Sequence, residues 1–304
     1  MKLGFSLVFV MSIVIALTIN AIATVMPVSA DFDGDGKTDM ATYIPETGKL
    51  TISLSSNGEI GSDYIFQNCI PVTADYDGDH KADPAGYDIK SGKWTILLSG
   101  NGYASACGYV PKEAIPVPGN YDSDGKTDLA TFDEKSKTWT IFLSSIGYEE
   151  RKFQFPLGVG GTIIPCPGDF DGDDKIDPSV YIPEIGYWVM MLSGNEYIIQ
   201  AELYIGPGGT PLVGDFDGDG KDEPAQYNPE SISWDFMSSG RNISISTWMW
   251  NIKPGGSPII GDYDGNGASD LTIVNMNLWH VIFISTDPPI PGWFSSQLIT
   301  FQFP

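Results

Sequence analysis

A nine-residue acidic segment occurs six times along this 304-residue chain, and this repetition constrains the fold more than any other feature. The six copies, named loops 1 to 6, are DFDGDGKTD (31–39), DYDGDHKAD (75–83), NYDSDGKTD (120–128), DFDGDDKID (169–177), DFDGDGKDE (215–223) and DYDGNGASD (262–270). Their first residues are 44, 45, 49, 46 and 47 positions apart. A regular period of this length is typical of an array of one structural unit.

Each loop lies at the same place in a longer repeated pattern. A proline stands four residues before every loop, a small residue stands directly before it, and its second position is always Phe or Tyr. An alternating stretch such as DMATY or DPAGY follows, and in four copies a tryptophan stands nineteen residues past the loop start. This alternation, rich in aromatic and β-branched residues, indicates half-buried strands. Frequent Gly and Pro argue against long helices, and the aromatic residues at fixed positions are expected in the core.

Four short strands in each repeat of about 45 residues predict one blade of a β-propeller. We therefore predict an all-β protein, a single β-propeller of six blades with four antiparallel strands each, closed by packing between whole blades. The repeats occupy about 24–68, 69–113, 114–162, 163–208, 209–255 and 256–304. The alternative is a seven-bladed ring with one degenerate blade. The proline fits the start of an innermost strand, where a missing N–H is tolerated, and the small residue indicates crowding where blades meet.

The first 23 residues differ in character from the repeats. Lys2 is followed by LGFSLVFVMSIVIALTI, an apolar run typical of a secretion signal. Small-residue cleavage motifs are present at 21–23 (AIA) and 28–30 (VSA). MPVSADFDG aligns with IPVTADYDG of the second repeat, so cleavage after Ala30 would remove the first strand. We predict cleavage after Ala23 and a secreted, periplasmic or cell-surface location without membrane insertion of the mature chain; an uncleaved anchor is the alternative.

The charge of the chain restricts its partners. It has 39 acidic and 16 basic residues and a formal net charge of −23. Phosphate binding needs clustered Lys and Arg, and the sequence has no basic run, so we expect neither nucleic acid nor an anionic membrane as a partner. Of the 39 acidic residues, 24 lie in the six loops, which indicates cation binding beyond general solubility.

The loops have the composition of a site for a hard divalent cation. Positions 1, 3, 5 and 9 offer side-chain oxygens and position 7 a backbone carbonyl, and Ca²⁺ accepts about six to eight oxygen ligands at flexible geometry. Mg²⁺ fits less well because it prefers a tight octahedron. We predict up to six Ca²⁺ ions, one per blade. The predicted ligands are Asp31, Asp33, Asp35, Lys37 and Asp39; Asp75, Asp77, Asp79, Lys81 and Asp83; Asn120, Asp122, Asp124, Lys126 and Asp128; Asp169, Asp171, Asp173, Lys175 and Asp177; Asp215, Asp217, Asp219, Lys221 and Glu223; and Asp262, Asp264, Asn266, Ala268 and Asp270.

Differences among the copies predict differences among the sites. Glycine at position 6 permits a turn with positive φ; His80 and Asp174 replace it in loops 2 and 4, and both residue types tolerate that conformation. Asn120 and Asn266 leave loops 3 and 6 with one carboxylate fewer at the ligand positions, so these sites are expected to be weaker. At position 9 of loop 5, Glu223 has a longer side chain than the aspartate of the other loops.

Two other interpretations of the loops fit the sequence less well. Solvated acidic turns without an ion are disfavoured because neighbouring carboxylates repel one another. A helical EF-hand or dockerin unit shares the loop, but strand patterns follow the ninth position here. Six Ca²⁺ ions would change the net charge from −23 to −23 + 12 = −11, so we expect cation binding to stabilise the fold.

The repeated DFDGDGKxDxAxY followed by a tryptophan strand resembles the bacterial FG-GAP-like, or VCBS-type, repeats, which are similar to the calcium-loop blades of integrin α-subunits. The resemblance covers essentially the whole chain after residue 23. It implies a β-propeller with Ca²⁺ in the turn that joins the first two strands of each blade, at the five loop positions named above.

No catalytic constellation stands out. The two histidines are His80, inside loop 2, and His280, in a strand pattern, and no GxSxG or phosphate-cradling loop occurs. We therefore predict a monomeric, non-catalytic binding or adhesion module for an extracellular glycan or protein, bound on the face opposite the loops. The alternative is a propeller-fold polysaccharide lyase that uses Ca²⁺ and a Lys, Arg or Tyr base, for which no residue is identified.

The three cysteines, Cys69, Cys107 and Cys166, are too few for a disulfide scaffold. A Cys69–Cys107 bridge is one alternative and two buried, inert thiols are the other. The sequence has no CxxC pattern, so we predict no zinc site.

Overall fold

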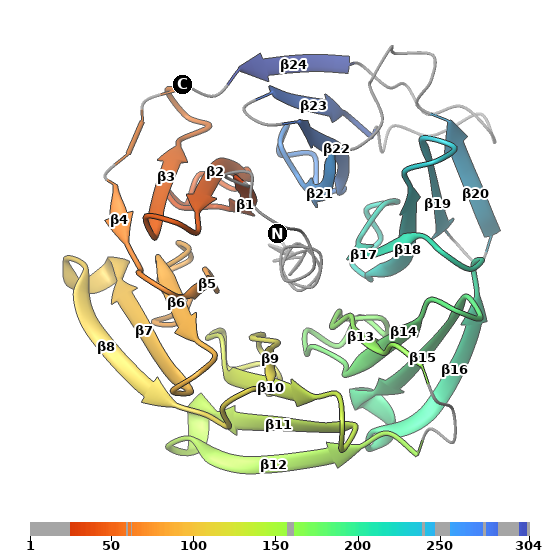
Figure 1. The fold of residues 1–304 in the computed structure, drawn as a ribbon, viewed down its shortest axis with the longest axis horizontal. Coiled ribbons are helices and arrows are strands. Elements are labelled where there is room, and N and C mark those ends of the chain that lie inside the picture. The colour runs from red at the N-terminus through yellow and green to blue at the C-terminus, as the bar shows by residue number, and fades with distance from the viewer. Residues whose placement is uncertain are drawn as a thin grey trace.

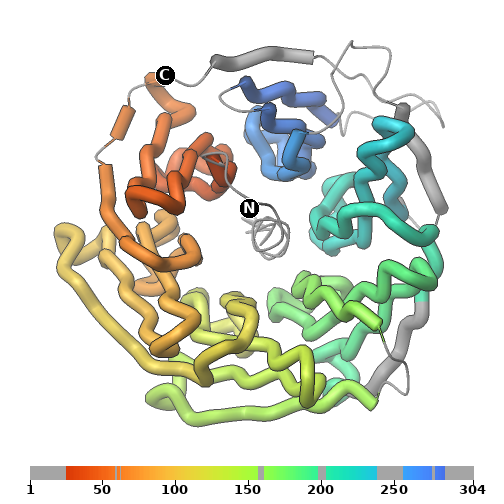
Figure 2. The backbone as a smooth tube through the Cα atoms, viewed as in Figure 1, coloured from red at the N-terminus to blue at the C-terminus, as the bar shows by residue number. Residues whose placement is uncertain are grey.

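The computed structural model describes residues 25–302 except 59, 62, 157–160, 239–240, 247–255, 276–277 and 285–297. The described residues form six four-stranded antiparallel sheets arranged as a ring (Figure 1). Each sheet takes four consecutive strands, and the blades follow one another around the ring in chain order (Figure 2). The predicted six-bladed propeller is thus confirmed and the seven-bladed alternative is wrong. The predicted signal segment, 1–23, lies outside the described residues.

The strands form four classes from the centre of the ring outward. The innermost are β1 (Met26–Ala30), β5 (Ile70–Pro71), β9 (Ile115–Pro116), β13 (Ile164–Pro165), β17 (Thr210–Gly214) and β21 (Ser257–Gly261). The second are β2 (Asp39–Ile44), β6 (Ala85–Asp88), β10 (Leu129–Asp133), β14 (Ser179–Ile182), β18 (Glu223–Asn228) and β22 (Asp270–Asn275). The third are β3 (Lys49–Ser53), β7 (Lys93–Leu98), β11 (Thr138–Leu143), β15 (Tyr187–Leu192), β19 (Ser233–Ser238) and β23 (Leu278–Ile282). The outermost are β4 (Tyr64–Ile65), β8 (Ala104–Tyr109), β12 (Glu149–Gln154), β16 (Ile198–Tyr204), β20 (Arg241–Ser246) and β24 (Leu298–Gln302).

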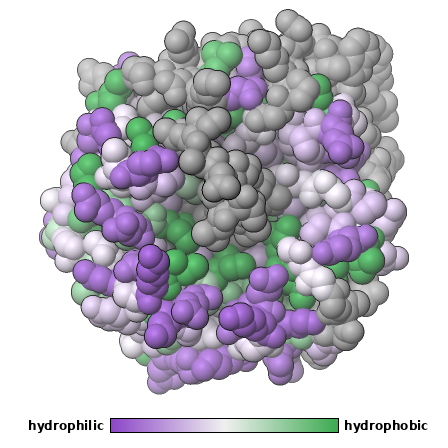
Figure 3. All heavy atoms as spheres, viewed as in Figure 1, coloured by the Kyte–Doolittle hydropathy of each residue, from purple (hydrophilic) through white to green (hydrophobic). Residues whose placement is uncertain are grey.

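Three short 3-10 helices, η1 (Ser99–Asn101), η2 (Ser144–Ile146) and η3 (Ser193–Asn195), follow the third strands of blades 2, 3 and 4. No helix in the described part of the chain has the length and apolar character needed to cross a membrane. On the face shown in Figure 3, hydrophilic side chains predominate toward the rim and hydrophobic ones lie nearer the centre.

The repeated proline lies in the innermost strand of every blade, as predicted. This strand is an edge of its sheet, so a residue without an N–H leaves the ladder intact. The six prolines are Pro27, Pro71, Pro116, Pro165, Pro211 and Pro258.

The core of each blade contains a pair of large hydrophobic side chains across its second and third strands, and in blades 2 to 5 both are aromatic. Trp94 pairs with Tyr87 across β6 and β7, with ring centroids 5.0 Å apart and both side chains fully buried. The corresponding pairs are Phe132–Trp139, Tyr181–Trp188, Tyr227–Trp234, Val274–Trp279 and, in blade 1, Tyr43–Leu50. The prediction that the tryptophans at this repeated position are core residues is confirmed.

Neighbouring blades approach one another at the small residue before each loop. A Cβ added to Gly119 would lie 2.8 Å from Cγ1 of Ile176, which stands at position 8 of the next loop. Only glycine leaves room for this side chain, so the predicted crowding between blades is confirmed. The same contact recurs for Gly168 with Asp222, Gly214 with Ser269 and Gly261 with Thr38.

Candidate metal centres

Each loop connects the innermost strand of its blade to the second strand, and the residues at its two ends pair with each other in antiparallel fashion. The residue before position 1 pairs with position 9, as Ala30 does with Asp39 and Gly119 with Asp128. This pairing brings the two ends of every loop together and folds the positions between them into a tight turn.

Carboxylates gather inside five of the six loops. In loops 1, 2, 4 and 6, oxygen atoms of positions 1, 3 and 9 lie within 4.8 Å of one another, and in loop 5 the position-5 carboxylate joins them. The clusters are Asp31, Asp33 and Asp39; Asp75, Asp77 and Asp83; Asp169, Asp171 and Asp177; Asp262, Asp264 and Asp270; and Asp215, Asp217, Asp219 and Glu223. Loop 3 carries Asn120 at position 1 in place of a carboxylate.

Position 1 is oriented by backbone donors of its own loop. In loop 1, Oδ1 of Asp31 accepts a 2.6 Å hydrogen bond from the N–H of Gly34, and Oδ2 accepts a 2.9 Å bond from the N–H of Gly36. Burial raises the pKa of Asp31, although these two bonds oppose the rise. Asp75 accepts the corresponding bonds from Gly78 and His80. In loops 1 and 2 the backbone therefore wraps around the first carboxylate.

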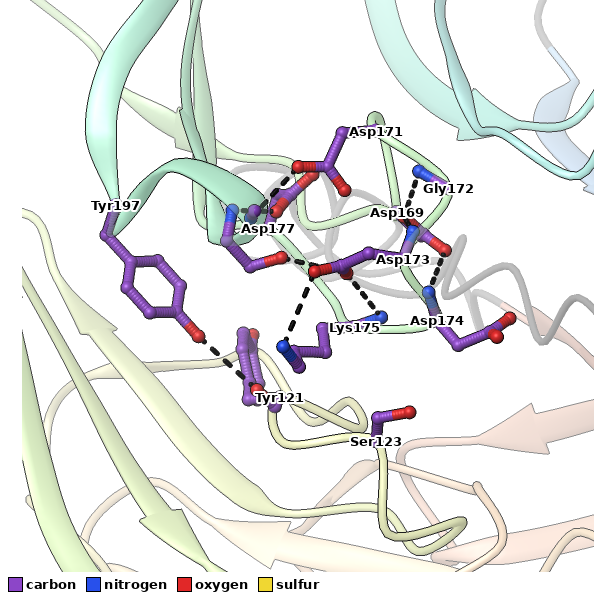
Figure 4. Close-up of polar contacts among 12 residues, drawn as sticks. Tyr121, Ser123, Asp169, Asp171, Gly172, Asp173, Asp174, Lys175, Asp177 and Tyr197 are labelled. Carbon is purple, nitrogen blue, oxygen red and sulfur yellow. Dashed lines mark hydrogen bonds and ion pairs between the residues drawn. The ribbon is translucent and has the colours of Figure 1, made fainter.

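At position 3 of loops 2 and 4, one buried carboxylate oxygen has no hydrogen-bond partner. In loop 4, shown in Figure 4, Oδ2 of Asp171 accepts a 3.0 Å bond from the N–H of Gly194, whereas Oδ1 is buried without a hydrogen-bond partner. Asp77 in loop 2 repeats this arrangement with Gly100. Buried polar atoms normally have a partner, and an anionic oxygen facing other carboxylates is a natural ligand for a cation. The residues therefore fit a bound divalent metal.

Position 5 accepts a hydrogen bond from a serine hydroxyl that lies just after the third strand. The Oγ of Ser193 donates a 2.9 Å hydrogen bond to Asp173 in loop 4. Ser55 and Ser99 donate in the same way to Asp35 and Asp79. The sequence pattern includes this serine, but sequence reasoning assigned it no role at the site.

Position 9 is a fully buried aspartate in loops 1, 2, 3, 4 and 6 and a partly buried glutamate in loop 5. Oδ2 of Asp177 accepts a 2.9 Å bond from the N–H of Phe170, and Oδ1 accepts a 2.6 Å bond from the N–H of Ser193. Burial, with repulsion from Asp171, raises the pKa of Asp177 to about 7. Burial is also the largest cause that raises the pKa of Asp39, Asp83 and Asp128 to about 6, of Asp270 to about 8 and of Glu223 to about 9.

The backbone turns as predicted at position 6. Gly36 has φ +85°, and His80 and Asp174 adopt the same left-handed region at +68° and +65°. Position 4 also requires it, with φ +76° at Gly34 and +64° at Ser123. Sequence reasoning overlooked position 4, although glycine recurs there in five of the six loops.

Six backbone hydrogen bonds join the loops into a closed ring. The N–H at position 8 of each loop donates to the position-1 carbonyl oxygen of the preceding loop, over 2.6–2.8 Å. The donor–acceptor pairs are Ala82–Asp31, Thr127–Asp75, Ile176–Asn120, Asp222–Asp169, Ser269–Asp215 and Thr38–Asp262. Every candidate ligand at position 1 is therefore tied through its own backbone to the next loop.

None of these carboxylate clusters contains a histidine or a cysteine. His280 lies on β23, and burial lowers its pKa. All three cysteines are free thiols, so the Cys69–Cys107 bridge is not formed. The expectation that Cys69 and Cys107 are both buried is wrong: Cys69 is half-buried, and Cys107 is exposed on β8, the outermost strand of its sheet.

Comparisons with known proteins identify the fold. Neither a protein-family model nor a curated protein sequence matches the chain. Among solved structures, a lectin from Agrocybe aegerita that recognises non-reducing terminal N-acetylglucosamine is similar over 92% of this chain and 80% of its own, with 12% identity and a TM-score of 0.59. A catalytically inactive virginiamycin B lyase from Staphylococcus aureus with quinupristin is similar over 94% and 86%, at 11% identity and a TM-score of 0.55. The BBS1N chain from a complex with ARL6DN is similar over 93% and 82%, at 12% identity and a TM-score of 0.54. A binding protein and an enzyme thus share this propeller architecture, and fold alone does not assign function.

Proposed function

We propose that the chain is an exported, calcium-stabilised β-propeller with FG-GAP-like repeats, and that it acts as a non-catalytic binding module. The observation that carries this proposal is the gathering of three or four carboxylates within 4.8 Å in five loops. These groups repel one another, and burial raises the pKa of the position-9 carboxylates. A divalent cation would offset the repulsion and give each buried oxygen a partner.

Positions 1, 3 and 9 would supply the side-chain oxygens that hold calcium, with positions 5 and 7 completing the predicted ligand set. The ion would supply structural charge neutralisation and would take part in no reaction. Loop 5 is the strongest candidate, because Asp219 and Glu223 bring its cluster to four carboxylates. Loops 3 and 6 are the weakest, because Asn120 and Asn266 each replace a carboxylate.

The proposed ligand surface lies at the other end of blade 4. Tyr187 begins β15 and Tyr204 ends β16, so this cross-strand pair lies at the end of the sheet away from loop 4. Their ring centroids are 5.4 Å apart with a 54° tilt, and the residues are 39% and 56% exposed. Ile185, two residues before Tyr187 in the chain, is exposed as well. Exposed apolar groups gathered in this way mark interaction sites.

A glycan is the ligand chemistry that this surface favours. Each tyrosine combines an apolar ring face, which packs against the C–H groups of a sugar ring, with a hydroxyl that hydrogen-bonds to sugar hydroxyls. The two rings are held by adjacent strands, so little conformational entropy is lost when a ligand binds.

A glycan array probed in calcium and in EDTA tests this proposal. We expect glycan binding that falls at least about tenfold in Tyr187→Ala and in Tyr204→Ala. Tyr109→Ala is the matched control, because Tyr109 is 68% exposed at the position of blade 2 that corresponds to Tyr204 but pairs with Lys93 instead of a tyrosine. Turnover of a polyuronide that a point mutation outside the loops abolishes would contradict the binding-module proposal.

A further inference from the structure

Asp222, at position 8 of loop 5, is bound to loop 4 by two hydrogen bonds. Its backbone N–H donates to the carbonyl oxygen of Asp169 at 2.7 Å, and its Oδ2 accepts a bond from the N–H of Asp169 at 2.9 Å. Asp169 is the first candidate ligand of loop 4. One residue of blade 5 therefore holds both backbone polar groups of a candidate metal ligand in blade 4, the carbonyl oxygen through its backbone N–H and the N–H through its side chain.

The structure makes room for this contact. A Cβ added to Gly168, directly before loop 4, would lie 3.1 Å from Oδ2 and 3.2 Å from Cβ of Asp222. The glycine thus lets the carboxylate reach the N–H of Asp169. At the other five junctions position 8 is Thr38, Ala82, Thr127, Ile176 or Ser269, and none of these side chains carries a carboxylate.

The carboxylate of Asp169 is fixed from its own side as well. Oδ1 accepts a 2.6 Å bond from the N–H of Gly172, and Oδ2 accepts a 2.9 Å bond from the N–H of Asp174 (Figure 4). The orientation of this candidate ligand therefore depends on two sets of contacts, one inside loop 4 and one from Asp222.

We propose that Asp222 is a positioning residue that couples the cation sites of loops 4 and 5, so that filling one site favours filling the other. This inference rests on the proposed function, in which both loops bind calcium. Asp222 directly precedes Glu223, a candidate ligand of loop 5. An ion held by Glu223 restrains the adjoining peptide unit, and through Asp222 that restraint reaches the backbone of Asp169. Loop 4 then loses less conformational entropy when its own ion binds.

Charge alone provides a different explanation that experiment separates from positioning. A carboxylate between two cation sites attracts both ions whether or not it is hydrogen-bonded. Asp222→Asn keeps an oxygen that accepts the bond from Asp169 but removes the charge. Asp222→Ala removes the acceptor and keeps the backbone bond, as Ala82 does with Asp31 at 2.7 Å between loops 1 and 2.

Calorimetric calcium titrations of the full chain measure the coupling. Asp171→Ala disables loop 4, Asp217→Ala disables loop 5, and the double variant completes a cycle. We expect loop 4 to bind calcium on the order of tenfold more weakly when loop 5 is disabled. Asp77→Ala combined with Asp217→Ala is the matched control, because loops 2 and 5 are not neighbours and their effects are expected to add.

The same cycle in the two Asp222 backgrounds decides the mechanism. We expect Asp222→Ala to abolish the coupling between loops 4 and 5, and Asp222→Asn to retain it. Unchanged coupling in Asp222→Ala, or its loss in Asp222→Asn, would overturn the positioning role.

Near-ultraviolet circular dichroism of each variant confirms that the fold is kept, and the asparagine variant keeps the test decisive where the alanine variant does not fold. If the unaltered chain binds calcium but the effects of disabling loops 4 and 5 add, the coupling alone is overturned. If the unaltered chain binds no calcium, the proposed function is overturned as well.

Discussion

The backbone N–H of Thr38 donates a 2.7 Å hydrogen bond to the carbonyl oxygen of Asp262, and this bond joins loop 1 to loop 6. Thr38 belongs to the first blade and Asp262 to the last, so the contact closes the ring between distant parts of the chain (Figure 1). The innermost strands β1 and β21 lie beside each other at the same junction. Each sheet consists of consecutive strands, so closure depends on loop contacts and packing, without a shared strand.

Gly261→Ala is expected to weaken this junction. The added Cβ would lie 2.6 Å from Cγ2 and 2.8 Å from Oγ1 of Thr38, a distance at which one of the two blades has to move. We expect the free energy of unfolding to fall by about 1–3 kcal/mol, measured by urea denaturation. Adding Thr38→Ala removes the two nearest atoms and should recover part of the loss. An unchanged midpoint in Gly261→Ala would show that the blades do not meet as described.

Calcium is expected to raise the melting temperature strongly. Each site adds about 2.7 kcal/mol of stability when free calcium is 100 times its dissociation constant, and up to six sites contribute. Tryptophan fluorescence during heating, in EDTA and in millimolar calcium, measures the shift. Magnesium at the same concentration should produce a smaller one. Asp77→Ala should reduce the calcium shift without removing it, and equal melting temperatures in EDTA and calcium would rule out structural calcium sites.

The free energy of unfolding of the calcium-free protein should fall as pH rises, which is the opposite of the trend in a protein with salt-bridged carboxylates. Burial raises the pKa of Asp177 to about 7 and of Asp270 to about 8, whereas an unfolded aspartate has a pKa of about 3.9. Between these values the folded state holds more protons than the unfolded state, so the free energy of unfolding falls as pH rises. Their stabilising contribution is therefore complete below about pH 4 and lost by about pH 8.

Urea denaturation in EDTA at pH 5, 6.5 and 8 measures this dependence. We expect the highest stability of the three at pH 5, and saturating calcium should reduce or reverse the trend because the ion competes with the protons. A calcium-free protein that gains stability steadily from pH 5 to pH 8 would contradict the raised pKa values.

Local signals in the sequence predict most of the fold and the backbone of the loops. The left-handed turn at His80 and Asp174 was predictable, because the loop motif alone requires it. The burial of Trp139 was predictable, because alternation and a fixed position in the repeat place it on the inner face of its strand.

Contacts between blades were not predictable in the same way. The bond from Thr38 to Asp262 and the two bonds from Asp222 to Asp169 depend on which residues of different repeats meet in the ring. Within a single repeat, position 8 is simply a variable residue. The exposure of Cys107 was missed for a related reason, since it depends on the position of β8 as the outermost strand of its sheet.

Replacing His80 with glycine should stabilise the protein. His80 holds φ at +68° at position 6, where its Cβ crowds the following carbonyl oxygen and glycine has no such penalty. We expect His80→Gly to raise the free energy of unfolding in EDTA by about 1 kcal/mol. The bond from its N–H to Asp75, at 2.8 Å, uses the backbone and is kept. Gly36→His in loop 1 is the reverse control and should destabilise by a similar amount; a loss of stability in His80→Gly would mean that the imidazole makes a contact that outweighs the strain.

Trp139 should tolerate leucine far better than alanine. Its side chain is fully buried, its ring centroid lies 5.5 Å from that of Phe132, and Nε1 donates a 3.0 Å hydrogen bond to the hydroxyl of Tyr121. Trp139→Ala leaves a large cavity and should cost about 3–5 kcal/mol in urea denaturation. Blade 1 carries Leu50, fully buried, at the corresponding position opposite Tyr43. Trp139→Leu should therefore cost clearly less, and equal losses in the two variants would mean that the hydrogen bond to Tyr121, which both remove, stabilises the blade more than the packing does.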